Sequence, residues 1–259
     1  MATQRKLAVV GGSSLDQLAV LEKPRQLVVD TPYGKPSGPL IYGLLNGHEV
    51  VFLARHGERH QLPPHRINYR ANLWALHAQG ITDVVAVATV GGIGANFHAG
   101  VLAVPDQLID YTWGRESTFF DGEFHGGDAG ASIVKHIDFT QPYDEALRAR
   151  VLRAAQRVEI PLFNGGTYAT TQGPRLETAA EIQRLARDGA HMVGMTGMPE
   201  AALARELGLR YACLALVVNA AAGTGASVKA IDLSAAEVLA REAMTRVVRL
   251  LLEIAANGD

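Results

Sequence analysis

The run VVAVATV, residues 84–90, followed by Gly91 and Gly92, decides the fold. It is almost continuously apolar and rich in β-branched residues, whereas a strand with one face in water alternates apolar and polar side chains. A run of this kind predicts a parallel strand that is buried on both faces. The same character recurs in residues 7–10, 50–54, 101–104 and 211–218.

Helical patterns lie between these runs. Residues 69–80 and 177–189 repeat apolar side chains at helical spacing and end in a glycine, and residues 199–208 begin with a proline. Ser234, with Glu237 three residues later, predicts a capping box at the start of the C-terminal helix. Strands that alternate with helices predict an α/β fold, with helices on both faces of a twisted, largely parallel (mixed) central sheet.

The composition excludes several classes of protein. The 259 residues carry 24 basic and 26 acidic side chains, and this near balance gives no electrostatic footprint for nucleic acid or a membrane surface. The apolar runs are shorter than the roughly 20 residues that cross a bilayer. Residues 1–6 show no signal peptide, so we expect a cytoplasmic protein. The length fits one domain, residues 1–259. The only cysteine, Cys213, excludes an intrachain disulfide and a cysteine-based metal site.

Ligands of open α/β sheets bind beyond the carboxyl ends of the strands, where four junctions of this chain carry anion-binding groups. The junctions contain Gly11-Gly12-Ser13-Ser14, Arg55-His56, Thr89 with Gly91-Gly92, and Thr196 before a helix. Taken singly, the first could be a tight turn and the second a surface arginine with a capping histidine. Together, their glycine backbones, hydroxyls and guanidinium predict one phosphate site. The G-x-G-x-x-G spacing of a dinucleotide loop is missing.

Longer motifs occur in order along the chain: Gly11-Gly12-Ser13, Ala54-Arg55-His56-Gly57, Asn68-Tyr69-Arg70-Ala71-Asn72-Leu73-Trp74-Ala75-Leu76, Gln172-Gly173-Pro174-Arg175 and Gly194-Met195-Thr196-Gly197-Met198-Pro199-Glu200. Together they resemble the trimeric purine nucleoside phosphorylase and methylthioadenosine phosphorylase family over nearly the whole chain. The resemblance implies a nucleoside phosphorylase-like fold and a homotrimer with sites at its subunit interfaces. It implies these phosphate ligands: Ser13, Arg55, His56, Thr89, the backbone N–H of Val90, and Thr196. At the position of Ser13 the family prefers threonine, which keeps the hydroxyl.

The resemblance also implies phosphorolysis of an N-glycosidic bond. Cleavage develops oxocarbenium character on the ribose and negative charge on the purine, so the site has to position phosphate and stabilise the base with preorganised hydrogen bonds. We expect His56 and Asn219 to be catalytic and Met195 to pack against the ribose, and His60 is similar to a nearby family histidine. The reaction needs no metal or organic cofactor, and inorganic phosphate is a co-substrate beside the nucleoside.

Two positions indicate a 6-oxopurine base. Asn219 stands where the methylthioadenosine branch carries an aspartate, and its amide can donate as well as accept, so it can face N7 and O6. Ala221 replaces a second family aspartate. Glu177 matches the glutamate with which inosine and guanosine phosphorylases accept the base N1–H, although acidic residues are also common at helix N-termini. Leu176 is expected to pack on the purine face.

The C-terminal helix indicates an apolar 5′ group. Ala235 takes the position of a histidine that binds the 5′-hydroxyl in inosine and guanosine phosphorylases. Val238 and Leu239 add an apolar surface that leaves a hydroxyl without a partner, although both also fit the core face of a helix. His136 resembles a family histidine that reaches the 5′ site of the neighbouring subunit.

An oxopurine base with an apolar 5′ group describes 5′-methylthioinosine. We therefore expect its phosphorolysis to hypoxanthine and 5-methylthioribose 1-phosphate, a step of purine salvage. Within the family, the alternatives are a phosphorylase of inosine and guanosine or one of methylthioadenosine. A protein that senses a nucleoside or phosphate without catalysis is disfavoured by the combination of Arg55, His56 and Thr196. A dinucleotide-dependent oxidoreductase is disfavoured by the loop spacing.

Overall fold

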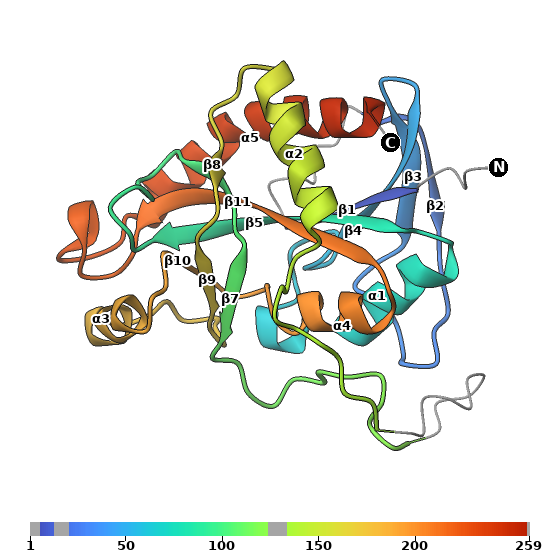
Figure 1. Ribbon diagram of the computed structural model, residues 1–259, viewed down its shortest axis with the longest axis horizontal. Coiled ribbons are helices and arrows are strands. Elements are labelled where there is room, and N and C mark those ends of the chain that lie inside the picture. The colour runs from blue at the N-terminus through green and yellow to red at the C-terminus, as the bar shows by residue number, and fades with distance from the viewer. Residues whose placement is uncertain (1–5, 13–20, 124–133, 258–259) are drawn as a thin grey trace.

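The computed structural model describes residues 6–12, 21–123 and 134–257. Within these residues eleven strands form one mixed sheet, with helices packed against both faces (Figure 1). The long strand β5 (Asp83–Gly92) lies at its centre and pairs in parallel with β1 (Leu7–Gly11) on one side and β11 (Arg210–Ala220) on the other. β1 continues in parallel to β4 (His48–Ala54). The predicted α/β fold is confirmed.

Four helices cover the two faces of the sheet: α1 (Tyr69–Ala78), α2 (Glu145–Arg157), α4 (Glu200–Glu206) and α5 (Leu233–Ala256). Ala8 and Val10 of β1 join the core that includes α1 and α4, whereas Leu7 and Val9 join the core that includes α2 and α5. Figure 1 shows these helix pairs on opposite faces. Because each central strand serves two cores, it has no polar face, and its sequence is continuously apolar.

Strand β6 (Leu102–Val104) matches a predicted run, but six strands lie outside the predicted ones: β2 (Glu22–Leu27), β3 (Leu40–Leu45), β7 (Gln107–Asp110), β8 (Phe163–Asn164), β9 (Thr167–Thr170) and β10 (Met192–Gly194). β2 is exposed along its whole length at one edge of the sheet, so no apolar pattern marks it. β10 pairs antiparallel with the end of β5 and parallel with β9. This pairing brings the loops after β9 and β10 to the carboxyl end of β5.

Helix α3 (Ala179–Arg187) begins later than its apolar pattern predicts. The side chain of Thr178 accepts a hydrogen bond from the backbone N–H of Glu181, and the Glu181 carboxylate accepts one from the backbone N–H of Thr178. This capping box fixes the N-terminus of the helix at Thr178, because both side chains accept from backbone N–H groups that would otherwise be unpaired. Glu177 therefore lies before the helix, where its side chain can turn toward the loops of the sheet.

Helix α5 also begins at a different residue from the predicted one. Asp232 is its N-cap, since Oδ1 accepts from the backbone N–H of Ala235 at 2.9 Å. The predicted capping box of Ser234 and Glu237 is wrong, because aspartate two residues earlier already caps the helix. Among the helices of the described residues, α5 included, none combines the length and apolar character needed to cross a bilayer.

Candidate active site

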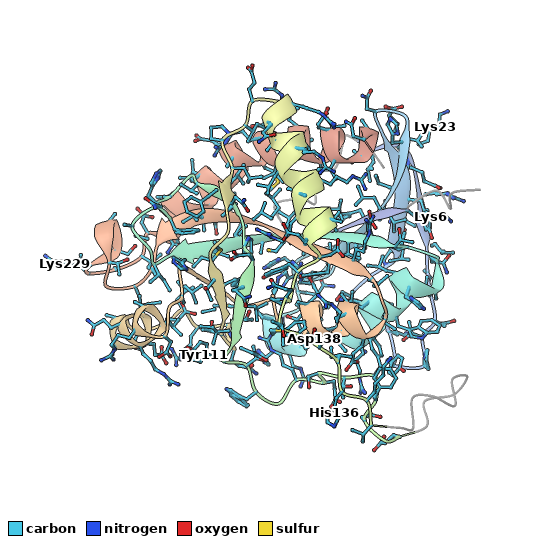
Figure 2. All side chains as sticks on the ribbon, in the orientation of Figure 1. Lys6, Lys23, Tyr111, His136, Asp138 and Lys229 are labelled. Atoms are coloured by element: carbon cyan, nitrogen blue, oxygen red, sulfur yellow. The ribbon has the colours of Figure 1, made fainter. Side chains whose placement is uncertain are left out.

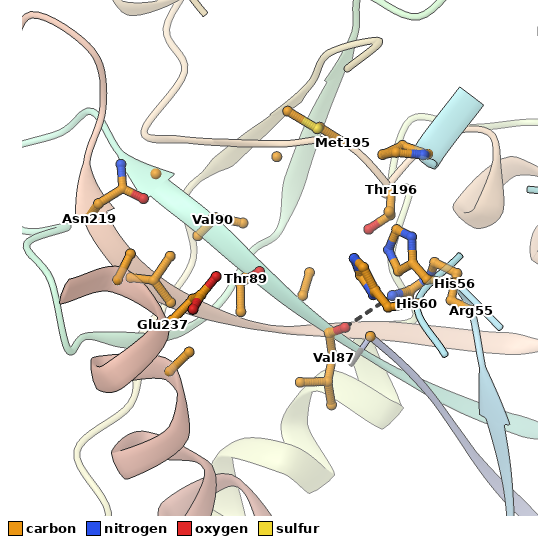
Figure 3. A pocket seen from close by; sticks show the side chains of 18 of the residues that line it. Arg55, His56, His60, Val87, Thr89, Val90, Met195, Thr196, Asn219 and Glu237 are labelled. Atoms are coloured by element: carbon orange, nitrogen blue, oxygen red, sulfur yellow. Dashed lines mark hydrogen bonds between the residues drawn. The ribbon is translucent and has the colours of Figure 1, made fainter. Parts of the chain in front are cut away.

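A cavity of about 1080 Å³ opens at the carboxyl ends of β5 and β11. Figure 3 shows Arg55 and Thr196 at one end of its wall, Asn219 at the other, and Thr89 of β5 between them. Most of the predicted site residues line this cavity: Arg55, His56, His60, Thr89, Val90, Leu176, Glu177, Met195, Thr196, Asn219 and Ala221. The structure thus brings together residues from five separate segments, as expected for the strand ends of an open sheet.

Helix α5 lines the cavity with residues other than the predicted ones, among them the apolar Ala236, Ala240 and Met244 and the charged Glu237, Arg241 and Arg249. The apolar members recur at helical spacing and are buried, so they fix which side of the helix faces the interior. Ala235, Val238 and Leu239 do not line the cavity, and Val238 is 52% exposed. The apolar surface of α5 is therefore present but is formed by neighbouring residues, and the Glu237 carboxylate extends into the cavity beside it (Figure 3).

Two other predicted residues are not part of this wall. His136 is exposed and does not line the cavity. Figure 2 shows it at the edge of the molecule, in the connection that precedes α2. His136 is predicted to reach the 5′ site of a neighbouring subunit. The structure of a single chain does not test this role, which stays a prediction. Ser13, the predicted phosphate ligand after β1, lies outside the described residues.

Arg55 is buried in an ion pair with Glu200, the first residue of α4. Nε donates to Oε2 at 2.6 Å and Nη2 to Oε1 at 2.8 Å, and the two residues are 1% and 0% exposed. Nη1 and Nη2 also donate to the carbonyl oxygens of Val87 and Val10, at 3.2 and 3.3 Å. Burial acts to lower the pKa of the guanidinium, but the charge and hydrogen bonds of Glu200 outweigh it and raise the pKa above its ordinary value.

These bonds determine what Arg55 can offer to an anion. They use four of the five guanidinium N–H groups and leave one on Nη1. The bidentate fork that the sequence assigns to phosphate binds Glu200 instead, and the carboxylate neutralises the charge. An anion at this end of the cavity therefore depends on hydroxyl and backbone donors as well, among them Thr89 and the largely buried Thr196.

His56 lies at the same end of the cavity in a defined tautomer. Its Nδ1 is 2.8 Å from the carbonyl oxygen of Leu62, which can only accept, so Nδ1 carries the proton. Burial lowers the pKa of His56 to about 4, and the positive charge of Arg55 acts in the same direction. The imidazole is neutral at pH 7 and presents Nε2 as an acceptor. The ring of His60 packs beside it, with centroids 4.4 Å apart.

The low pKa of His56 makes stability depend on pH. Between pH 6.5 and 4 the folded chain binds fewer protons at His56 than the unfolded chain, so the free energy of unfolding falls as the pH drops through this range. The full loss is roughly 3 kcal/mol. We expect His56→Asn, which keeps a donor toward Leu62 but does not titrate, to lack this part of the decline. Urea denaturation of both proteins across this range measures it, and parallel declines would contradict the assignment.

At the other end of the cavity, neighbouring groups hold Glu177 and Asn219. The hydroxyl of Thr171 donates to Oε1 of Glu177 at 2.5 Å. Nδ2 of Asn219 donates to the carbonyl oxygen of Ala220 at 2.6 Å, which leaves a second N–H and Oδ1 for a ligand. The register of β11 shifts between Val217 and Asn219, and a bulge of this kind re-aims the side chains that follow it.

Packing of α3 brings these two residues to one region. Ala221, two residues after Asn219, shares an apolar cluster with Ile182 and Leu185 of α3. Glu177 lies just before this helix, so it reaches the cavity on the side formed by the end of β11. A carboxylate acceptor and an amide that can donate therefore face one space, as recognition of a ring with both an N–H and a carbonyl requires.

Glu200 and Thr171 support the site but have no role in the sequence-based prediction. Glu200 is the last residue of the motif that contains Thr196. Acidic residues are common at helix N-termini, so its identity alone does not indicate a buried ion pair with an arginine. It is 145 positions from Arg55, so their contact depends on the sheet topology. Thr171 directly precedes another motif, and its hydroxyl beside a strand end is the only signal in the sequence.

Comparison with known proteins gives the same assignment of family. A profile of the phosphorylase superfamily matches residues 6–253. The chain is 57% identical over 233 residues to the probable S-methyl-5′-thioinosine phosphorylase of Xanthomonas campestris pv. campestris, which covers 90% of this chain and 89% of that protein. It is 46% identical over 218 residues to the probable 6-oxopurine nucleoside phosphorylase of Thermococcus kodakarensis, covering 84% and 80% of the two chains.

The fold is similar to that of solved enzymes. Methylthioadenosine phosphorylase from Schistosoma mansoni, in complex with adenine, superposes with a TM-score of 0.89 at 32% identity. The superposition covers 97% of this chain and 91% of that chain. The similarity therefore extends over nearly the whole chain.

Proposed function

Because the chain belongs to the phosphorylase superfamily, we propose that it cleaves the N-glycosidic bond of S-methyl-5′-thioinosine with phosphate. The products are hypoxanthine and 5-methylthioribose 1-phosphate. One observation carries this proposal: a single cavity is lined both by the hydroxyls of Thr89 and Thr196 and by the pair Glu177 and Asn219, and Thr196 and Asn219 lie at opposite ends of its wall (Figure 3). The thioinosine and 6-oxopurine phosphorylases among its relatives support the same class of base.

Phosphate binds, in this proposal, beside Arg55, His56, Thr89, the backbone N–H of Val90 and Thr196. Ser13 is a further proposed ligand. One oxygen of phosphate attacks C1′ as the bond from C1′ to N9 breaks, and the electron pair of that bond leaves with the purine. Hydroxyls and backbone N–H groups hold the nucleophile in place, which removes much of the entropic barrier. Neutral His56 can accept a hydrogen bond from a protonated phosphate oxygen through Nε2. No metal or organic cofactor takes part.

The base binds between Leu176 and the pair of polar residues. The Glu177 carboxylate accepts the N1–H of hypoxanthine, and the free N–H of Asn219 donates to O6 or N7. These bonds become stronger as negative charge develops on the departing base, so they stabilise the transition state more than the substrate. Met195 packs against the ribose.

The 5′ group decides between two nucleosides. Ala236, Ala240 and Met244 form an apolar surface on α5 that suits a methylthio group. Phosphorolysis of inosine or guanosine is the second candidate function, because the Glu237 carboxylate extends into the same cavity and could accept a 5′-hydroxyl (Figure 3). In either case we propose a cytoplasmic homotrimer that acts in purine salvage, in which His136 approaches the 5′ site of a neighbouring subunit.

The decisive experiment compares phosphate-dependent release of the base from methylthioinosine, methylthioadenosine and inosine. We expect methylthioinosine to have the highest kcat/KM, with inosine about 10- to 100-fold lower because burial of an unpaired hydroxyl costs a few kcal/mol. Faster cleavage of methylthioadenosine would contradict the base assignment, and faster cleavage of inosine would favour the second candidate. Reactions without phosphate are the control for simple hydrolysis.

A further inference from the structure

Arg115 lies in the connection between β7 and α2, outside every segment to which a role in the reaction has been assigned. Its half-buried guanidinium nevertheless contacts the segment after β10. Nη1 donates to the carbonyl oxygens of Met195 and Met198, at 2.9 and 2.6 Å. These two carbonyls stand on either side of Thr196 in the chain, so Arg115 holds the loop that carries this hydroxyl from both ends.

The same guanidinium holds the segment after β9. Nη2 donates to the carbonyl oxygens of Thr171 and Gln172, at 3.3 and 2.9 Å, and Nε donates to Oε1 of Gln172 at 3.2 Å. Thr171 in turn donates to Glu177 at 2.5 Å. Arg115 therefore contacts Thr171, which itself binds the Glu177 carboxylate. It also contacts Met195, which directly precedes Thr196 in the chain.

The partners of Arg115 are all uncharged. A further bond joins Nη1 to the hydroxyl of Tyr69 at 3.3 Å, and the guanidinium carbon lies 5.5 Å from the centre of the Tyr69 ring. Within the described residues, Arg115 forms no ion pair with a carboxylate. The positive charge thus strengthens these hydrogen bonds to backbone carbonyls, because a hydrogen bond from an ionised donor is stronger than one from a neutral donor.

We propose that Arg115 is a positioning residue that fixes the base-binding segment 171–177 and the phosphate-binding segment 195–198 relative to each other. The inference rests on the proposed function. Only arginine supplies five N–H groups in a planar fork, and six acceptors from three segments surround it here. Lysine could replace the charge but has three donors on one nitrogen. Loss of Arg115 therefore misplaces both substrates together, although its side chain contacts neither of them.

The test is steady-state kinetics of Arg115→Met with methylthioinosine and phosphate varied in turn. We expect kcat/KM to fall about 100-fold for both substrates, the effect of misplacing reacting groups by about 1 Å. Arg115→Lys should recover only part of the loss. Added guanidinium chloride at millimolar concentration should raise the activity of Arg115→Met but leave the wild type unchanged. A purely structural residue would lower the melting temperature without this rescue.

Arg246→Met is the matched control, because Arg246 also donates to a backbone carbonyl, that of Gly100 at 2.9 Å, but does not line the cavity. We expect its kinetic constants to match the wild type. If Arg115→Met keeps wild-type kcat and KM below its melting temperature, the positioning role is wrong while the proposed function stands. If the wild type itself releases no base from any of the three nucleosides, the proposed function fails, and the role of Arg115 fails with it.

Discussion

Glu200→Ala is expected to lower the free energy of unfolding by about 3–5 kcal/mol, because it leaves the buried Arg55 guanidinium without a counter-ion. Both residues are almost completely buried, and the ion pair is bidentate. The loss also frees the hydroxyl of Tyr211, which donates to the same carboxylate at 2.8 Å. Urea denaturation at pH 7 measures the change. We expect kcat/KM to fall about 100-fold as well, since Arg55 loses its orientation at the phosphate end.

A double variant separates folding from function. Arg55→Met with Glu200→Leu removes both charges, and replacing a buried ion pair by apolar residues is often neutral or stabilising. We expect the double variant to regain most of the stability that Glu200→Ala loses, while phosphorolysis remains impaired. If the double variant is as unstable as Glu200→Ala, the packing of the Arg55 and Glu200 side chains, and not their charge, supports the fold.

The central strands could be predicted from the sequence because burial on both faces leaves an unbroken apolar run. β1, β4, β5 and β11 all have this signature, and β5 and β11 also carry the cavity. β2 could not be predicted, because an exposed edge strand is defined by its backbone pairing with β3 and shows no apolar face. Strands of two to four residues, such as β8 and β10, are too short to show a period.

Much of the cavity wall could be predicted because chemistry at strand ends is local in sequence. Thr89 and Asn219 lie near the carboxyl ends of the predicted strands β5 and β11, and Thr196 lies shortly before the predicted helix α4. Contacts between distant segments could not be predicted, and these decide how the residues act: the pairing of Arg55 with Glu200 uses most of the donors assigned to phosphate. The family resemblance indicates Ala235, Val238 and Leu239 for the 5′ pocket, but packing of α5 against the sheet turns Ala236, Ala240 and Met244 toward the cavity instead.

Asn219→Asp is expected to reduce the preference for methylthioinosine over methylthioadenosine by about 100-fold, because discrimination by buried hydrogen bonds is large when a group is left unpaired. A carboxylate can only accept, so it repels O6 of an oxopurine and accepts from the 6-amino group of adenine. The carboxylate also cannot donate to the carbonyl oxygen of Ala220, as the amide does at 2.6 Å. It must therefore turn away from that carbonyl, which leaves both oxygens for a ligand.

The measurement is the ratio of kcat/KM for the two nucleosides in direct competition. Asn219→Ala is the control, since it removes donor and acceptor together and should slow both substrates without reversing their order. Adding Glu177→Ser to Asn219→Asp should move the ratio further, because the acceptor held by Thr171 would otherwise face the unprotonated N1 of adenine. If Asn219→Asp keeps the wild-type ratio, Glu177 alone discriminates between the bases, and the amide serves only to stabilise the departing purine.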